Sequence, residues 1–478
     1  MKQEYVLLRV GLVGIGLDTY WNQFAGLQGR LEEYTAAVAN HLQGPEITII
    51  NLGLLDNIDR SLEISHTCRK EDIDVLVVHI ATYALSSIVL PVVQRAGVPV
   101  LLLNLQPSAS INYTRLNHMG DREAMTAEWL AYCSSCAVPE LSNVLRRLGM
   151  PVQIVTGSLE GDPGCWMEMV AWLKAAAVKK MLAHSRLGVI GHYYGGMLDI
   201  TTDLALISGR FGLYIEQLEA DEITENRRYL SETAVKDKLL EFQKYFLIEP
   251  DCQVMELDRA ARTAVAIDVL VHEHDLDLLA YYYKGSGIPE QADVMSSMIL
   301  GASVLTGRGI PVAGEYEVKN VIAMKILDRF EAGGSFSEFY ALDLEHDHVL
   351  MGHDGPGHVG IAEGKSRVKQ LRSYHGKVGS GLSVEMSVRH GPVTLLSIAE
   401  DASRGYKFVV AQGESVPGPI LEIGNTNSRY KFSLGARRFV TEWSAAGPAH
   451  HCAIGAGHIV PLIEKLATLL HIPVQQIC

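Results

Sequence analysis

The chain has 478 residues, of which 48% are hydrophobic and 20% are charged, and its formal net charge is −14. A chain of this length buries more than one core, since a domain typically contains about 150 residues. The acidic balance argues against nucleic-acid and anionic-membrane partners, because both need a basic face, and a small neutral substrate fits the composition better.

The N-terminal segment and the apolar stretches argue against export and membrane insertion. Residues 1–16 break their apolar run with Glu4, Arg9 and glycines, unlike the continuous apolar core of a signal peptide. The apolar-rich region 74–105 is interrupted by polar residues, so it falls short of the ~18 apolar residues that a membrane span requires. We therefore expect a cytoplasmic protein.

The seven cysteines are scattered through the chain, and their odd number is not typical of a disulfide framework. We expect most of them to be buried thiols. Cys133 and Cys136 form a CxxC motif in a helix-like segment, 127–148, without a second pair at zinc-finger spacing. This context favours a packing role for the pair over a redox or metal role.

The first 180 residues alternate strand-like and helix-like segments. Short β-branched runs, each followed by a helical pattern, are typical of a parallel sheet covered on both faces. The strand-like segments are 6–16, 47–53, 74–80 and 98–106, and the helix-like segments are 22–42, 58–70 and 86–97. The pattern predicts a doubly wound, Rossmann-like α/β domain over residues 1–184.

The loop after the first strand is a candidate ligand site. The glycines at 11–16 do not form a GxGxxG motif, which disfavours a dinucleotide. Open α/β sheets bind ligands at the carboxyl ends of their strands, and Asp18, Tyr20 and Trp21 offer hydrogen bonds and a stacking face at that position. We expect these three residues to contact a sugar.

A second α/β unit begins near residue 186. The strand-like segments 187–194 and 213–223 alternate with helix-like stretches at 224–244, 259–273 and 291–306. This predicts a second Rossmann-like domain over 185–328.

The character of the sequence changes after about residue 365. Alternating residues with Gly, Asp and Pro turns predict antiparallel β structure, as a small barrel or a sandwich, before a final amphipathic helix. We expect a β-rich, barrel-like C-terminal domain over 329–478.

The stretch 314–358 concentrates carboxylates and imidazoles around glycine-rich turns. Divalent cations such as Mn²⁺ are bound by these two kinds of group. Glu317 is either a group behind such a site or a surface acid, and it would share a face with Glu315 on a strand. Four candidate ligands come from well-separated segments, namely Glu315, Glu338, His353 and His451.

The segments AGEYEVKN, GGSFSEFY, MGHDGPGH and GPAHHC that contain these residues resemble the L-arabinose isomerase and L-fucose isomerase superfamily. In the arabinose isomerases, four segments of this kind each give one Mn²⁺ ligand, and the matching positions occur here in the same order. The resemblance covers nearly the whole chain. It implies two α/β domains and a β-rich C-terminal domain that carries most of the metal ligands.

The resemblance also implies an activity. The chain would be a metal-dependent aldose–ketose isomerase that acts on a small sugar through a cis-enediol, with Glu315 and Glu338 as the metal-bound acid–base pair. It would form a homo-oligomer, a hexamer or a tetramer, with active sites at subunit interfaces. A metal-dependent epimerase or lyase on a sugar or sugar acid, and a non-catalytic sugar-binding protein, are the alternatives.

Further substrate contacts follow from the same resemblance. The loop 115–123 ends in the family's Gly-Asp-Arg-Glu pattern and nominates Asn117 or His118. HYYGGMLDI resembles a turn that presents a methionine to the active site, which nominates Met197 and Asp199. His358 lies in the HDGPGH turn, where the chain departs from the arabinose isomerase pattern, and its role as ligand, proton shuttle, substrate contact or structural residue stays open.

Overall fold

The computed structural model describes residues 7–284, 287–371, 380–401 and 405–478. The chain divides into two compact units, Met1–Lys180 and Met181–Cys478. The boundaries expected at 184 and 328 stay predictions. Within the described ranges, every helix is too short or too polar to span a bilayer.

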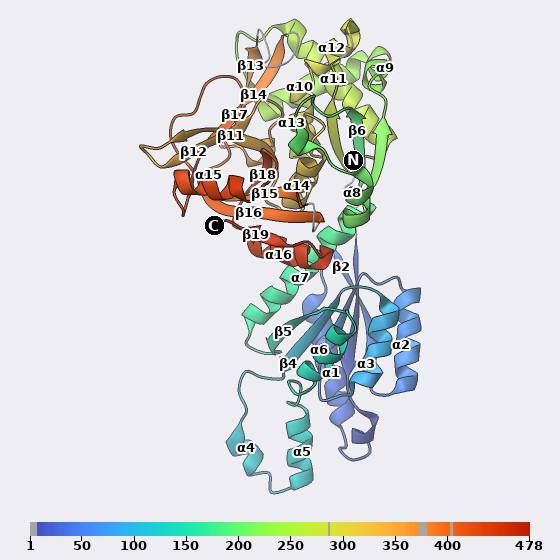
Figure 1. Cartoon of the computed structure of the whole chain (residues 1–478). Helices are drawn as coiled ribbons and strands as arrows, with labels where there is room; N and C mark the ends of the chain where they lie inside the picture. The colour runs from blue at the N-terminus through green and yellow to red at the C-terminus, as the bar shows by residue number, and fades with distance from the viewer. Residues whose placement is uncertain (1–6, 285–286, 372–379, 402–404) are drawn as a thin grey trace. The chain divides into compact units, whose positions relative to one another are not determined.

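The first unit contains a five-stranded parallel sheet with the order β2-β1-β3-β4-β5 (Figure 1). Its strands are β1 (Leu8–Ile15), β2 (Ile47–Leu55), β3 (Val75–His79), β4 (Val100–Gln106) and β5 (Val152–Ser158). Its helices are α1 (Leu27–Leu42), α2 (Ile58–Lys70), α3 (Ser86–Ala96), α4 (Tyr113–Asn117), α5 (Arg122–Leu130) and α6 (Ala137–Arg147), and α7 (Pro163–His184) contains the boundary between the units. The strand order reverses between β1 and β3, and ligands of open α/β sheets bind at such a reversal.

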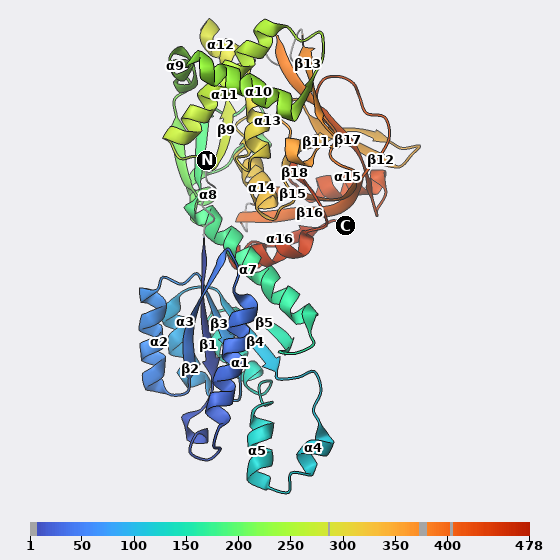
Figure 2. The same cartoon turned by 180° about the vertical axis from the view of Figure 1, so that it is seen from behind.

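Helices cover both faces of this sheet (Figure 2). Ile64 of α2, Val89 of α3 and Leu141 of α6 are buried in one apolar cluster, and Leu31 of α1 is buried in another. All five residues of β3 are buried, as a strand covered on both faces requires. The predicted doubly wound α/β fold is confirmed.

The second unit begins with a four-stranded parallel sheet of the order β10-β9-β6-β7. The strands of this part of the unit are β6 (Arg186–Gly191), β7 (Tyr214–Leu218), β8 (Phe246–Ile248), β9 (Leu278–Tyr282) and β10 (Val312–Ala313). Its helices are α8 (Leu204–Phe211), α9 (Glu222–Arg228), α10 (Glu232–Tyr245), α11 (Val254–Glu273), α12 (Pro289–Met295), α13 (Ile299–Gly307) and α14 (Val318–Arg329).

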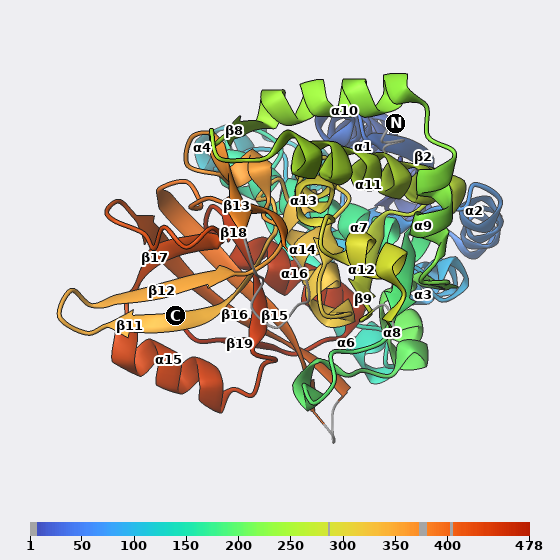
Figure 3. The ribbon, with the colours of Figure 1, turned by 90° about the horizontal axis from the view of Figure 1, so that it is seen from above.

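The C-terminal strands form a closed ring in the order β15-β18-β11-β12-β17-β16, which the pairing of β15 with β16 closes. Strand β19 adds to β16 in parallel, and the β11–β12 hairpin extends outward (Figure 3). The elements are β11 (Ser335–Asp343), β12 (His348–His353), β13 (Ser366–Leu371), β14 (Gly381–Glu385), β15 (Gly391–Asp401), β16 (Gly405–Val416), β17 (Thr426–Phe432), α15 (Ala436–Ala445), β18 (His451–Ala456), α16 (Val460–Leu470) and β19 (Val474–Gln476). A barrel, rather than a sandwich, is therefore the form of the expected β-rich region.

A third sheet joins the two parts of the second unit. Strand β8 pairs in parallel with β13, which pairs in turn with β14. Phe242 and Phe246 are buried in the same apolar cluster as Val368 and Val384. Residues on either side of position 328 therefore share one hydrophobic core.

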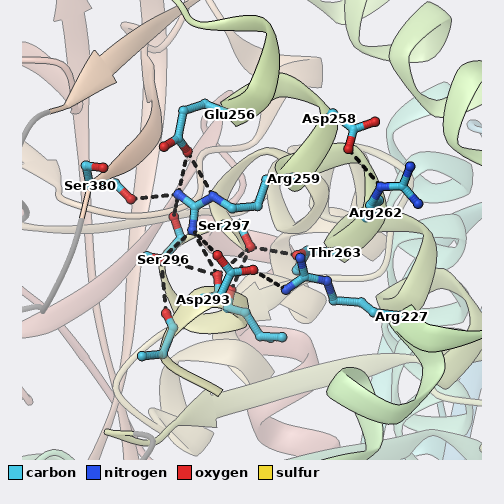
Figure 4. A network of polar contacts seen from close by, with 12 residues as sticks. Arg227, Glu256, Asp258, Arg259, Arg262, Thr263, Asp293, Ser296, Ser297 and Ser380 are labelled. Carbon is cyan, nitrogen blue, oxygen red and sulfur yellow. Dashed lines mark hydrogen bonds and ion pairs between the residues drawn. The ribbon is translucent and has the colours of Figure 1, made fainter. Parts of the chain in front are cut away.

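A polar network around Arg259 of α11 connects this helix to α9 and α12 (Figure 4). Its guanidinium donates hydrogen bonds to Glu256, to Asp293 and Ser296 at 3.2 and 2.6 Å, and to the carbonyl of Ser380 at 2.6 Å. Arg227 of α9 donates to the other oxygen of Asp293 at 2.6 Å. One part-buried guanidinium thus ties α11 to α12 and to the segment that enters β14.

Candidate metal centre

Glu315 lies in a tight turn between β10 and α14. Glu315 and Tyr316 have φ angles of +60° and +62°, in the left-handed region, which costs of order 1–3 kcal/mol for each such residue. The turn is held from two strand ends, because the carbonyl of Glu315 accepts from the N–H of Tyr194 at 3.3 Å and Tyr316 donates to the carbonyl of Tyr281 at 3.1 Å. Backbone strain of this kind concentrates at functional sites.

His451 begins β18 and meets Glu315 at the centre of the site. Its Nε2 lies 3.2 Å from Oε2 of Glu315, yet this nitrogen makes no hydrogen bond within the described residues. Two ligand atoms of one octahedral ion lie about 3 Å apart when each metal–ligand bond is about 2.1 Å. The spacing and the chemistry of these two donors fit a divalent cation.

A second carboxylate lies behind His451. Glu317 is fully buried, its Oε2 lies 3.4 Å from Nδ1 of His451, and its Oε1 accepts from the N–H of Asn320 and caps α14. Burial lowers the pKa of His451, but Glu315 and Glu317 outweigh it and raise that pKa to about 9. A bound cation would displace the imidazole proton and leave Glu317 to fix the ring. Of the two roles left open for Glu317, its burial excludes the surface acid, and its place behind a metal site stays a prediction.

Glu338 sits on the middle strand of three. It pairs with Gly352 of β12 on one side and with His451 of β18 on the other. Directly opposed residues of antiparallel strands share a face, so the side chains of Glu338 and His451 project to the same side. Burial raises the pKa of Glu338 above its usual 4.5, with the charges of Glu315 and Asp354 adding to the rise and those of the two histidines opposing it.

His353 ends β12 and completes the four predicted ligands. Its ring centroid lies 5.3 Å from that of His451, and Phe336 packs against both rings at 4.2 and 4.5 Å. Thr426 donates to the carbonyl of His353 and accepts from its N–H, which clamps the strand end. The fold therefore brings Glu315, Glu338, His353 and His451 together, while their roles as ligands stay predictions.

The sequence reasoning missed His450. The possible ligand atoms of Glu315, His450 and His451 all lie within 4.8 Å of one another, as a group that could hold a metal ion. Asp199 accepts from Nδ1 of His450 at 2.6 Å, and Nε2 of His450 lies 4.0 Å from Oε2 of Glu338. The sequence signal for this residue is the adjacent pair of histidines in GPAHHC.

Tyr281 and Tyr340 are buried phenols that interact electrostatically with carboxylates of this centre. Burial, Glu338 and Asp354 raise the pKa of Tyr340, which sits at an irregularity in the pairing of β11 with β12. Burial is the main reason that the pKa of Tyr281 is raised, and the negative charges of Glu315 and Asp354 raise it further. Bulges redirect side chains, so the direction of the Tyr340 side chain does not follow from strand periodicity.

The remaining predicted residues of the second unit are placed differently. Met197 is half-buried at the start of the short helix η2 (Leu198–Ile200). Nε2 of His358 lies 3.2 Å from Oδ1 of Asp328, and the ring lies beside Gly333 and Gly360. These contacts anchor the HDGPGH turn to α14. The substrate roles of Met197 and His358 stay predictions.

The predicted substrate residues of the first unit follow the carboxyl ends of two strands. Asp18 and Tyr20 form the short helix η1 after β1, and Nε1 of the adjacent Trp21 donates to Asp56 at 2.8 Å. Asn117 ends α4 after β4, and the exposed His118 bonds the carbonyl of Thr114 through Nδ1 at 2.7 Å. Because the strands are parallel, both segments lie at the carboxyl edge of one sheet. Their contacts with substrate stay predictions.

Comparison with known proteins adds a family match over the C-terminal part. Residues 333–473 match the model of the L-arabinose isomerase C-terminal domain. No curated protein matches the sequence.

Two solved structures show a weak likeness to the chain. A periplasmic solute-binding protein of an ABC transporter from Actinobacillus succinogenes 130z, with bound D-allose, is 12% identical over 63% of this chain and 82% of that one, with a TM-score of 0.17. An ABC transporter substrate-binding protein from Desulfitobacterium hafniense, in complex with Leu, is 13% identical over 70% of this chain and 71% of that one, with a TM-score of 0.14. Scores this low carry no argument about fold or function.

The family match covers three of the four predicted ligands, Glu338, His353 and His451, and it begins after the turn that holds Glu315. The resemblance is thereby confirmed over residues 333–473, and for the segment around Glu315 it stays a prediction.

Proposed function

We propose that the chain is a metal-dependent aldose–ketose isomerase that acts on a small sugar. The observation that carries this proposal is the approach of Glu315 to His451, whose ligand atoms lie 3.2 Å apart beside Glu338 and His353. The L-arabinose isomerase domain over residues 333–473 supports the same reaction class.

Glu315, Glu338, His353 and His451 would hold the ion, with Mn²⁺ as the first candidate because carboxylates and imidazoles suit it. When bound, the cation supplies positive charge that stabilises negative charge developing on the sugar oxygens. His450, oriented by Asp199, offers Nε2 as a further donor at the same place. Glu317 holds the far side of the His451 ring.

The two glutamates would move the proton. Interconverting an aldose and a ketose transfers a proton between C1 and C2 through a cis-enediol, so one group must take it while another serves the neighbouring oxygen. Burial raises the pKa of Glu338 in the metal-free chain, and a bound cation would lower it and keep the carboxylate ionised to accept a proton. We assign the acid–base work to Glu315 and Glu338 as a pair.

The test is proton exchange in D₂O. The protein is incubated with Mn²⁺ and a panel of tetroses, pentoses and hexoses, and the sugars are analysed by NMR and mass spectrometry. We expect an isomerised product with deuterium at C2 of an aldose or C1 of a ketose, and a loss of rate of about 10²–10⁴-fold in Glu338→Gln. The proposal would be refuted if no sugar gave either deuterium exchange or an isomerised product. Deuterium at C2 together with an epimer, but without a ketose, would instead identify an epimerase.

The exposed Glu345 provides a matched control on the same hairpin. Glu345→Gln removes a carboxylate from the stretch 314–358 without touching the centre, so it should keep full activity. A stoichiometric sugar complex without any metal requirement would favour a sugar-binding protein instead.

We also propose that the active protein is a homo-oligomer, a hexamer or a tetramer, in which Asn117 and His118 of one subunit complete the site of another. The support is the resemblance to the arabinose isomerases. The test uses two inactive proteins, the variant Glu338→Gln and the double variant Asn117→Ala with His118→Ala. When they are unfolded and refolded together, activity should return, because some sites are built from the unaltered parts of two different subunits. A refolded mixture that stays as inactive as its parts would contradict shared sites.

A further inference from the structure

Cys133 and Cys136 lie side by side in a turn. Their Sγ atoms are 3.0 Å apart, both thiols are free, and Cys136 is exposed while Cys133 is half-buried. The helix expected over 127–148 is broken, since α5 ends at Leu130 and α6 begins at Ala137. Ser134 and Ser135 separate the thiols, and serine side chains compete with helical backbone bonds. The packing role expected for the pair is therefore wrong for Cys136.

The turn already brings the two sulfur atoms close to bonding distance. A disulfide bond is about 2.0 Å long, so the two sulfur atoms need to approach by only about 1 Å. The N–H of Cys133 donates to the carbonyl of Leu130 at 3.1 Å, and the N–H of Ala137 donates to that of Ser134 at 3.2 Å. These bonds hold both ends of the turn against the flanking helices, so the backbone already keeps the two cysteines close to each other.

The two thiols differ in reactivity and face a residue of the candidate sugar loop. Burial and the neighbouring Cys136 raise the pKa of the Cys133 thiol, which keeps the proton on the less accessible sulfur. Cys136 is the N-cap residue of α6, and its sulfur is the accessible one of the two. Burial raises the pKa of Tyr20, and the charges of Cys133 and Cys136 raise it further, so both sulfur atoms act on this phenol.

We propose that Cys133 and Cys136 form a reversible redox site that exchanges with small aliphatic disulfides such as oxidised glutathione. The Cys136 thiolate attacks one sulfur of that disulfide, forms a mixed disulfide and releases one glutathione thiolate. Cys133 then loses its proton and attacks the sulfur of Cys136, which forms the intrachain bond and releases the second glutathione. Two protein thiols are oxidised, and one glutathione disulfide is reduced to two thiols.

The exchange has a local consequence. Oxidation removes both ionisable thiols from beside Tyr20, so the pKa of Tyr20 falls, and it ties the end of the turn after α5 to the start of α6. The thiol chemistry does not depend on the proposed isomerase activity, so a negative result for one proposal does not contradict the other.

The full chain is treated with excess oxidised glutathione and followed by intact mass spectrometry and by titration of free thiols. We expect the unmodified sequence to lose two thiols and gain no glutathione, with dithiothreitol restoring both. Cys133→Ser should retain one glutathione on Cys136, because the resolving thiol is gone, whereas Cys136→Ser should react far more slowly. Cys478→Ser, which alters a thiol elsewhere, should behave like the unmodified sequence.

A second readout keeps the inference falsifiable if a cysteine variant folds poorly. Oxidation of the unmodified sequence should lower the pH at which one tyrosine ionises, measured by phenolate absorbance, and Tyr20→Phe should abolish that change. The inference is overturned by retention of both thiols under oxidation, by a stable glutathione adduct on the unmodified sequence, or by equal adduct formation in the two serine variants.

Discussion

Asp199 accepts two hydrogen bonds from His450, one from its backbone N–H at 2.8 Å and one from Nδ1 at 2.6 Å. Asp199 lies after β6 of the parallel sheet, and His450 directly precedes β18 of the ring. The carboxylate fixes the imidazole so that Nε2 is the nitrogen on the side of Glu338. A carboxylate behind an imidazole is a usual feature of metal centres.

Removing the charge of Asp199 should weaken metal binding. In Asp199→Asn, the imidazole of His450 loses its charged acceptor, and changes of this kind lower metal affinity by about 10- to 100-fold. Titration calorimetry with Mn²⁺ measures the effect, with the exposed Asp237→Asn as a control that should bind normally. Equal affinity in the two variants would show that the Asp199–His450 pair lies outside the metal centre.

Lys319 should stabilise the fold through the segment that contains Asp199. Its buried Nζ donates to the carbonyls of Asp199 and Thr201 at 2.7 and 3.2 Å. Lys319→Met leaves both carbonyls without this donor, and hydrogen bonds that involve a charged group contribute about 1.5–3 kcal/mol each. Urea unfolding of Lys319→Met should show a free energy of unfolding that is lower by an amount of that order. The exposed Lys236→Met is the control and should change little. A Lys319→Met protein as stable as this control would contradict the role given to Lys319.

His353 and His358 should separate metal binding from stability. His353 packs with Phe336 and His451 at the centre, whereas His358 contacts Asp328 on α14. We expect His353→Gln to lose most of its Mn²⁺ affinity. We expect His358→Gln to bind Mn²⁺ normally but to unfold more readily, by about 1–3 kcal/mol, because a buried partner of Asp328 is lost. If calorimetry and urea unfolding showed instead that His358→Gln loses Mn²⁺ affinity while His353→Gln binds normally, His358 would be the ligand.

His274 gives a pH dependence with a definite sign. Burial lowers the pKa of His274, but hydrogen bonds to Glu216 and Glu222, each 2.8 Å long, outweigh burial and place it above the usual 6.5. The folded state therefore binds the proton more tightly than the unfolded state does. The resulting stability is fully present below pH 6.5 and is lost as the pH rises through the folded pKa.

The measurement compares urea midpoints of the unmodified sequence and His274→Gln at about pH 6 and about pH 9, on either side of the window. The difference between the two proteins should be largest at the lower pH and should shrink at the higher one. A difference that grows with pH would mean that Glu216 and Glu222 do not stabilise the protonated ring.

Local patterns were sufficient to predict the fold class and the four candidate ligands. Strand β3, buried on both faces, is apolar except for its last residue, His79, and such runs separated by helices predict a parallel sheet. Glu315, Glu338, His353 and His451 were found because each lies in a short motif of recognisable composition. Both signals depend on neighbours in the chain.

The contacts behind the ligands depend on packing between distant segments, which local patterns do not encode. Asp199 and His450 were each in a notable motif, but only the folded chain pairs them. Glu317 was considered on a strand, whereas the left-handed turn at Glu315 and Tyr316 starts a helix and makes Glu317 its buried cap. His358 lies close to His353 in sequence, yet its ring contacts α14.

The most direct test of the central claim is the stoichiometry of bound Mn²⁺, measured by elemental analysis and electron paramagnetic resonance after dialysis. We predict one ion per chain in the unmodified sequence and in Glu345→Gln. We predict none in the double variant Glu315→Gln with Glu338→Gln, once circular dichroism has established that this variant is folded. A folded double variant that retains its ion would place the metal elsewhere and would contradict the assignment of these glutamates.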